Sequence, residues 1–160
     1  MRLGFAAAAA LTMLSISANA AGPEPSGADS PRYVSLRAEG ANGRRGPGIE
    51  HRVDWIYERG GLPLQVLGES GPWRRVRDPD GAEVWMHVRN LDERAMAYVR
   101  TGAEMRRNPR ANAGVKAHLA PGVIGALTGC ENGWARVAVG GRVGWVEPAA
   151  LWGAEGCAGG

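Results

Sequence analysis

The chain has 160 residues, of which 19 are basic and 16 acidic, so its formal net charge is only +3. This balance does not suggest the clustered basic surface of a nucleic-acid-binding domain, so nucleic acid is not an expected partner. No segment shows sustained helical periodicity, which leaves an all-β fold as the expected class.

The first twenty residues have the layout of a secretory signal peptide. Arg2 provides the positive start, residues 3–14 form an apolar run of twelve, and Ala18-Asn19-Ala20 is a cleavage signal. A bilayer span needs about 20 apolar residues, so no transmembrane anchor is expected. We predict cleavage after Ala20 and a periplasmic or secreted protein, with a net charge of +2 once Arg2 is lost.

Residues 21–31 read AGPEPSGADSP and predict a disordered leader, because they lack apolar periodicity. The first folded unit is predicted at residues 32–93. Alternation and turn residues place its strands near 33–36, 62–67, 73–77 and 82–86, a tight turn at 78–81, and one helical turn at 87–91. Pro63 places the second of these strands at a sheet edge or the proline at its start.

The second folded unit is predicted at residues 94–153. Its strands are expected at 115–119, 122–127, 134–139 and 142–146, with a Gly-Gly hairpin turn between the last two. Residues 154–160 are expected to form a frayed tail apart from Cys157. The short join near residues 92–98 predicts that the two units pack against each other.

The two units repeat one another. Residues 61–76 read GLPLQVLGESGPWRRV and residues 122–137 read GVIGALTGCENGWARV. With an offset of 61 residues, Trp73 matches Trp134. The second copy then lacks one residue, after which Trp85 matches Trp145. Strands at short spacing, repeated in tandem, predict two small β-barrels. A domain of this size buries little surface, and its tryptophans supply much of what it buries.

These motifs resemble the bacterial Src-homology-3-like domain. The first copy carries R-x-G-P-G from Arg44, G-L-P-L-x-V from Gly61 and W-x-x-V from Trp73, and the second copy repeats the order. The chain resembles exported tandem proteins of this family from Gram-negative bacteria. The resemblance implies small barrels and roles in attachment to cell-wall peptides or in protein–protein contact, an inference by analogy of fold.

Cys130 and Cys157 are the two cysteines, and export favours a disulfide between them. Members of the family often carry a cysteine directly after the tryptophan of the second copy. Ala135 stands there in this chain, so the resemblance leaves Cys157 as the intramolecular partner of Cys130.

No pattern for catalysis or metal binding is visible. His51, His87 and His118 lie outside any zinc-binding spacing, and Cys130 and Cys157 lie in a turn and a tail rather than at the start of a helix. We therefore expect no enzyme activity, no metal and no cofactor. The catalytic class to be considered is a small wall-lytic cysteine enzyme, and the positions of these residues argue against it.

Five residues are candidates for ligand binding. Trp55 and Tyr57 lie in an extended loop predicted at residues 50–60, which has no aromatic counterpart in the second copy. Arg45 and Arg75 belong to basic clusters of the first unit, and Trp85 is one of the repeated tryptophans, for which core packing is the alternative. Exposed aromatics with arginines are typical anchors for peptides, and arginine suits carboxylates. The structural alternatives are that the aromatics pack onto their own barrel and that the arginines form a solvated face.

The sequence thus predicts an exported, non-catalytic binding module. Its expected ligand is a peptidoglycan stem peptide or an envelope protein. The alternative is a structural or regulatory subunit of a periplasmic enzyme, without affinity for the wall.

Overall fold

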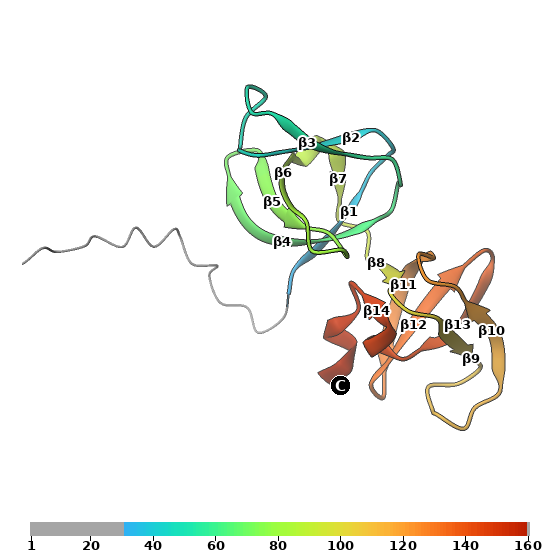
Figure 1. Cartoon of the computed structure of the whole chain (residues 1–160). Coiled ribbons are helices and arrows are strands. Elements are labelled where there is room, and N and C mark those ends of the chain that lie inside the picture. The colour runs from blue at the N-terminus through green and yellow to red at the C-terminus, as the bar shows by residue number, and fades with distance from the viewer. Residues whose placement is uncertain (1–30, 160) are drawn as a thin grey trace, which may run out of the picture.

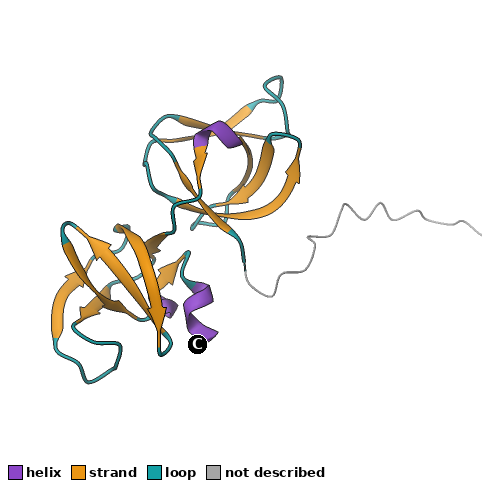
Figure 2. Ribbon diagram, turned by 180° about the vertical axis from the view of Figure 1, so that it is seen from behind, coloured by secondary structure: helices purple, strands orange, loops and turns teal. Residues whose placement is uncertain are grey.

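The computed structural model describes residues 31–159, which form two β-units joined in tandem (Figure 1). Each unit is a sheet of seven antiparallel strands that curls around its own core, with short 3-10 turns as its helical elements (Figure 2). The predicted signal peptide, and the predicted leader up to residue 30, lie outside the described residues. None of the helical segments within residues 31–159 has the length and apolar character of a membrane span.

The first unit follows the predicted order of strands. Its elements are β1 (Tyr33–Leu36), β2 (Ala41–Arg44), β3 (Val53–Tyr57), β4 (Pro63–Ser70), β5 (Trp73–Arg77), β6 (Glu83–His87), the 3-10 turn η1 (Val88–Asn90) and β7 (Leu91–Asp92). They pair in the order β3-β2-β6-β5-β4-β1-β7. Pro63 begins β4, where its missing N–H interrupts no later pairing.

The second unit repeats this topology. Its elements are β8 (Met96–Val99), β9 (Ala103–Arg106), β10 (Val115–Leu119), β11 (Ile124–Glu131), β12 (Trp134–Val139), β13 (Arg142–Val146), η2 (Pro148–Ala150), β14 (Leu151–Trp152) and η3 (Glu155–Gly159). The order β10-β9-β13-β12-β11-β8-β14 matches that of the first unit strand by strand. The register even shifts at the same place, between Val66 and Gly68 and between Leu127 and Gly129.

Each unit has its own hydrophobic core. In the first, Leu36, Leu64 and Met86 are fully buried, and in the second Met105 and Val146 are fully buried. Side chains alternate along β6, where Val84 and Met86 point inward between half-exposed neighbours. Apolar burial of this kind stabilises each unit and leaves the outward face of β5 and β6 free for charged residues.

The structure corrects the expectation of an extended loop at residues 50–60. Residues 53–57 form β3, which pairs with β2 with Tyr57 opposite Ala41 and Trp55 opposite Gly43. Burial alternates along β2 but not along β3, where three of the five residues are exposed. The hairpin exists because Tyr57 packs on the core and anchors its outer end.

The tail is also more ordered than predicted. Residues 155–159 form η3, and Ala154 and Cys157 are buried in the second core. The predicted disulfide is present, with 5.1 Å between the Cα atoms of Cys130 and Cys157. The cross-link and the two buried side chains hold a segment that its glycine-rich composition would otherwise leave frayed.

The two units contact each other, as the short join predicts. The indole Nε1 of Trp152 donates a hydrogen bond to the carbonyl of Pro63 at 3.0 Å, and its ring meets that of Tyr33 edge to face at 5.4 Å. The guanidinium of Arg59 donates to the carbonyl of Gly122. Trp152 is 7% exposed, so the second unit contributes a buried anchor to this contact.

Candidate functional site

The outward face of β6 carries a small pocket built around Trp85. The pocket has a volume of about 310 Å³ and is lined by Arg45, Arg75, Glu83, Val84 and Trp85. Trp85 lies opposite Arg75 of β5 and opposite Arg44 of β2, so antiparallel pairing places arginines on both sides of the indole. Three of the five predicted ligand-binding residues are therefore brought together.

Both pocket arginines already pair with carboxylates of the chain. Arg45 Nε lies 2.9 Å from both carboxylate oxygens of Asp54, and Arg75 Nη2 lies 2.5 Å from Glu83. The hydrogen bond from Arg45 holds the pKa of Asp54 below its usual range, and those from Arg77 and Arg75 do the same for Glu83. These ion pairs are largely exposed, with 60% of the Arg45 side chain accessible. Exposed pairs are weak, so a ligand carboxylate can compete for them.

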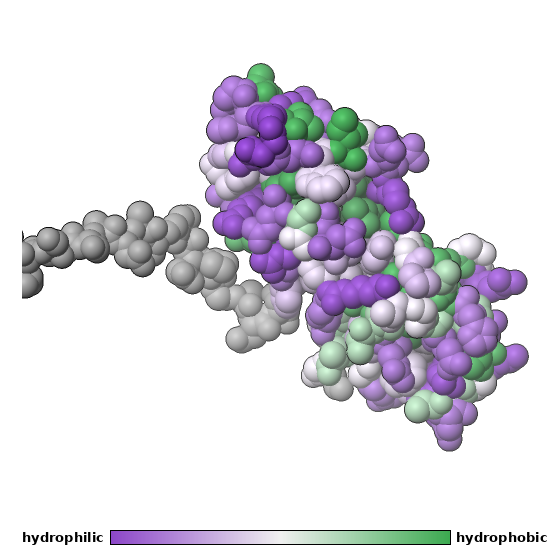
Figure 3. All heavy atoms as spheres, viewed as in Figure 1, coloured by the Kyte–Doolittle hydropathy of each residue, from purple (hydrophilic) through white to green (hydrophobic). Residues whose placement is uncertain are grey.

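The other two predicted residues lie outside this pocket. The hydroxyl of Tyr57 donates a 3.0 Å hydrogen bond to Asp78, and its ring packs against the first core. Burial, with the charge and hydrogen bond of Asp78 adding to it, raises the pKa of Tyr57. Trp55 is 57% exposed on β3. Ile49 and Ile56 are also exposed, with Ile56 on the opposite face of β3 from Trp55, so the β2–β3 hairpin carries exposed apolar side chains on both faces. Figure 3 shows hydrophobic residues among hydrophilic ones on this unit.

A neighbouring arginine has a structural role. Arg44 Nη1 donates to the carbonyls of Ile49 at 2.9 Å and His51 at 2.7 Å, which closes the turn between β2 and β3. Arg106, its counterpart, donates to the carbonyl of Ala113 at 2.7 Å. The first arginine of the repeated R-R pair thus holds its own loop, and Arg45 is the one that faces the pocket.

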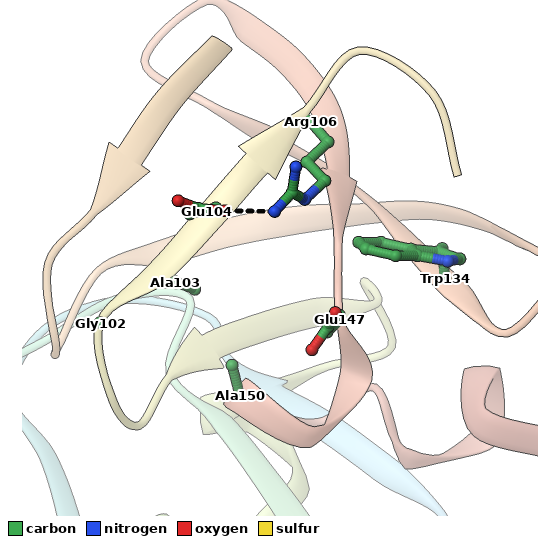
Figure 4. Close-up of a pocket in the computed structure, with 7 residues that line it drawn as sticks. All are labelled: Gly102, Ala103, Glu104, Arg106, Trp134, Glu147 and Ala150. Atoms are coloured by element: carbon green, nitrogen blue, oxygen red, sulfur yellow. Dashed lines mark hydrogen bonds and ion pairs between the residues drawn. The ribbon is translucent and has the colours of Figure 1, made fainter. Parts of the chain in front are cut away.

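The second unit has a different pocket, which the sequence analysis missed (Figure 4). It has a volume of about 160 Å³, with Trp134 on one side, Glu104 on the other and the side chain of Arg106 between them, and Glu147 also lines it. Arg106 pairs with Glu104, and within residues 31–159 no ion pair of Glu147 is formed. An aromatic ring beside a carboxylate suits an amine or another small cation. The signal in the sequence was the change from His87 to Glu147 at matching positions of the repeat.

The first unit closes the matching space with its own side chain. His87 meets Trp73, the counterpart of Trp134, edge to face at 5.2 Å. Its Nδ1 accepts a hydrogen bond from the backbone N–H of Arg89. The two barrels therefore share a fold but offer different chemistry at the same place.

The histidines are placed as expected, with His51 in a loop, His87 at the end of β6 and His118 within β10. Among the described residues, no group of three histidine, cysteine, aspartate or glutamate side chains is arranged to hold a metal ion. Asp78 accepts hydrogen bonds from the backbone N–H groups of Asp80 and Ala82, which is the chemistry of a tight turn.

Two successive barrels, each ending in a 3-10 turn and a short strand, define a tandem SH3-like protein. A family model described as "Bacterial SH3 domain" matches residues 37–93 and again residues 99–153. The chain belongs to this family, with two copies of the domain. The disulfide agrees with an exported member.

Solved structures offer a weaker comparison. The structure of NlpC2 from Trichomonas vaginalis is 17% identical with a TM-score of 0.35, and that of NlpC1 from the same organism is 18% identical with a TM-score of 0.34. They cover 79% and 80% of this chain, which spans about half of theirs, 49% and 48%. At this similarity they say nothing about its function. Among curated proteins, none matches the chain.

Proposed function

We propose that this protein is an exported, non-catalytic binding module that recognises carboxylate-bearing peptides of the cell wall through the Trp85 pocket. The observation that carries the proposal is the placement of Arg45 and Arg75 beside Trp85 in a pocket of about 310 Å³. An indole supplies apolar contact for a peptide, and arginine forks match carboxylates. Stem peptides of peptidoglycan are short and rich in carboxylates.

A ligand carboxylate would bind the pocket arginines by replacing their present ion-pair partners. Asp54 and Glu83 hold the guanidinium groups in place without burying them, so the exchange of one carboxylate for another costs little desolvation. The Trp134 pocket of the second unit adds a place for an amine. Together the two pockets suit a ligand with both kinds of charge.

The first experiment is sedimentation of residues 21–160 with purified peptidoglycan sacculi at low and at physiological salt. Retention that survives physiological salt supports the proposal. Retention at low salt alone indicates non-specific attraction, because screening removes it. Absence of retention at both would contradict the proposal and favour a protein ligand.

We expect Arg45→Gln combined with Arg75→Gln to reduce retention roughly tenfold, since two charge-assisted hydrogen bonds are lost. The matched control is Arg110→Gln with Arg142→Gln, which removes the same charge from exposed positions of the second unit. Equal retention by both double variants would show that the Trp85 pocket is not the binding site.

A second candidate function is that of a regulatory subunit of a periplasmic enzyme. The apolar surface of the β2–β3 hairpin favours it, because Ile49 and Ile56 are 74% and 63% exposed. Apolar side chains gathered on one exposed hairpin are typical of a protein–protein contact. Copurification of one stoichiometric partner, lost in Ile49→Ser with Ile56→Ser, would support this function over wall binding.

A further inference from the structure

The first unit has a wide groove beside η1 that differs from the Trp85 pocket. It has a volume of about 710 Å³, and its lining combines four arginines, three apolar residues and two acids: Arg32, Arg37, Arg74, Arg89, Val34, Val88, Leu91, Asp92 and Glu93. It lies where β5, η1 and β7 meet. No part of residues 31–159 fills it.

The second unit shows the same surface with a peptide segment lying on it. There η3 contacts β11, β12 and η2, which correspond to β4, β5 and η1 of the first unit (Figure 2). Its anchor, Cys130, pairs with Ala135 across β11 and β12. The equivalent pair in the first unit is Glu69 with Arg74, at the rim of the groove. The repeat therefore provides an occupied and an open version of one site.

The backbone confirms that the two versions correspond. The N–H of Arg37 donates to the carbonyl of Asn90 at 2.9 Å, and the N–H of Arg100 donates to the carbonyl of Ala150 at 2.9 Å. Arg37 in the open groove is thus the counterpart of Arg100 in the occupied one. In the occupied version Arg100 lies 3.5 Å from the carboxylate of Glu155, a residue of the covering segment.

The covering segment also shows which chemistry fits. Its small side chains, Ala154 and Cys157, are buried against the barrel, while its acidic side chain points to an arginine. A larger side chain would not fit as close to the sheet. The surface therefore accommodates a short turn that carries small side chains and a carboxylate.

We propose that the open groove of the first unit binds a short acidic peptide segment of a partner protein, in the way that η3 lies on the second unit. Small side chains of the partner pack on Val88 and Leu91, and its carboxylates meet Arg37 and Arg89. This site is separate from the Trp85 pocket and does not depend on wall binding.

The charges of the groove favour an acidic partner over a neutral one. Arg32 and Arg74 already pair with Glu69, and the two acids of the lining are paired as well, Asp92 with Arg94 and Glu93 with Arg32 at 3.7 Å. Within residues 31–159, neither Arg37 nor Arg89 forms an ion pair, although the guanidinium of Arg37 donates to the carbonyl of Leu91. Both are exposed at the rim. A carboxylate placed there gains charge-assisted hydrogen bonds without displacing one of the chain's own acids.

The test uses ¹⁵N-labelled residues 21–160 and two capped peptides, acetyl-AEAEAA-amide and its neutral analogue acetyl-AQAQAA-amide. We expect the acidic peptide to shift the backbone amide signals of the groove, those of Arg74, Val88 and Arg89, in a saturable manner. The neutral peptide should bind at least tenfold more weakly. The same titration with residues 31–160 establishes whether the preceding residues of the chain occupy the groove.

Two double variants locate the binding. Arg37→Gln with Arg89→Gln should weaken the acidic peptide roughly tenfold, which corresponds to the loss of charge-assisted hydrogen bonds. Arg110→Gln with Arg142→Gln, which removes the same charge from the second unit, should leave the affinity unchanged. Because all four side chains are exposed, the fold should tolerate these changes.

Several results would overturn the proposal. Equal affinity for the two peptides would remove the role of charge, and shifts confined to the Trp85 pocket would place the ligand elsewhere. Binding that appears only in residues 31–160 would make the chain's own leader the occupant rather than a partner. Absence of shifts in both lengths of chain would exclude an acidic peptide as the ligand.

Discussion

Tyr57 links the β2–β3 hairpin to the turn between β5 and β6. Its hydroxyl donates to one carboxylate oxygen of Asp78, and the other oxygen accepts the backbone N–H groups of Asp80 and Ala82. Asp78 is 7% exposed, so its hydrogen bonds are made away from water. Burying a carboxylate costs free energy unless hydrogen-bond donors contact it, and Tyr57 is one of the three donors to Asp78.

We expect Tyr57→Phe to lower the free energy of unfolding by about 1–2 kcal/mol at neutral pH, because Asp78 loses a donor while the ring stays in place. The wild-type chain should also lose stability as the pH rises above about 10. Burial and Asp78 raise the pKa of Tyr57 in the folded state, so unfolding releases the proton more readily at alkaline pH. Urea unfolding at pH 7 to 11 measures both effects.

Two controls accompany this prediction. Burial, followed by the hydrogen bond and charge of Glu155, also raises the pKa of Tyr33, so part of the alkaline loss should remain in Tyr57→Phe. Trp55→Phe changes an exposed aromatic of the same hairpin and should leave the unfolding midpoint nearly unchanged. An equal loss of stability in Trp55→Phe would show that Trp55 is a packing residue after all.

The sequence alone predicts the structural role of some of these side chains and not of others. Core packing was the expected role of all four repeated tryptophans; Trp73 and Trp134 are buried, whereas Trp85 and Trp145 are only half-buried. The adjacent arginines Arg44 and Arg45 look alike in the sequence, yet one closes a loop and the other lines a pocket. That difference depends on the register of β2, which no local pattern encodes.

At the scale of elements, the disulfide determines whether η3 covers the second unit. Replacing both Cys130 and Cys157 by alanine should lower the stability of that unit by about 3–4 kcal/mol, the loop entropy expected for a separation of 27 residues. In a reducing buffer, the free energy of unfolding of the wild-type chain, measured by thermal unfolding, should fall by a similar amount. The double variant should not respond to the reductant.

The loss of stability should be confined to the second unit. Hydrogen exchange should accelerate in η3 and β11, whereas β4 and β5 of the first unit should stay protected. The same thermal midpoint in oxidised and reduced wild-type chain would show that Ala154 and the rest of η3 hold their place without the cross-link.

The elements with strong turn signals were predictable from the sequence. The Asp78-Pro79-Asp80-Gly81 turn and the Gly140-Gly141 turn lie between β5 and β6 and between β12 and β13. Strands β2 and β3 were not predicted, because β2 is mostly polar or glycine and the residues of β3 do not alternate between apolar and polar. Pairing with β6 at a single position, Arg44 opposite Trp85, fixes them in the sheet, and such long-range pairing cannot be read from neighbouring residues.

At the scale of the whole molecule, one side chain outside the repeat connects the two units. Trp152 has no aromatic counterpart in the first unit, where Asp92 occupies the equivalent place after Leu91. Its ring lies against Tyr33, and Arg100 stacks over it at 4.6 Å. The sequence indicated contact between the units through their short join, but not this anchor, since a residue that breaks the repeat has no pattern to predict it.

The anchor predicts how the molecule unfolds. Trp152→Ala removes a buried ring and its hydrogen bond to Pro63, so we expect a loss of about 3–5 kcal/mol and a single calorimetric transition that separates into two, one for each unit. Trp152→Phe retains the stacking with Tyr33 and loses only the hydrogen bond, so it should cost about 1 kcal/mol and keep one transition. If the wild-type chain already unfolds in two transitions that Trp152→Ala leaves unchanged, the units are energetically independent. In that case a ligand bound by the first unit would not stabilise the second.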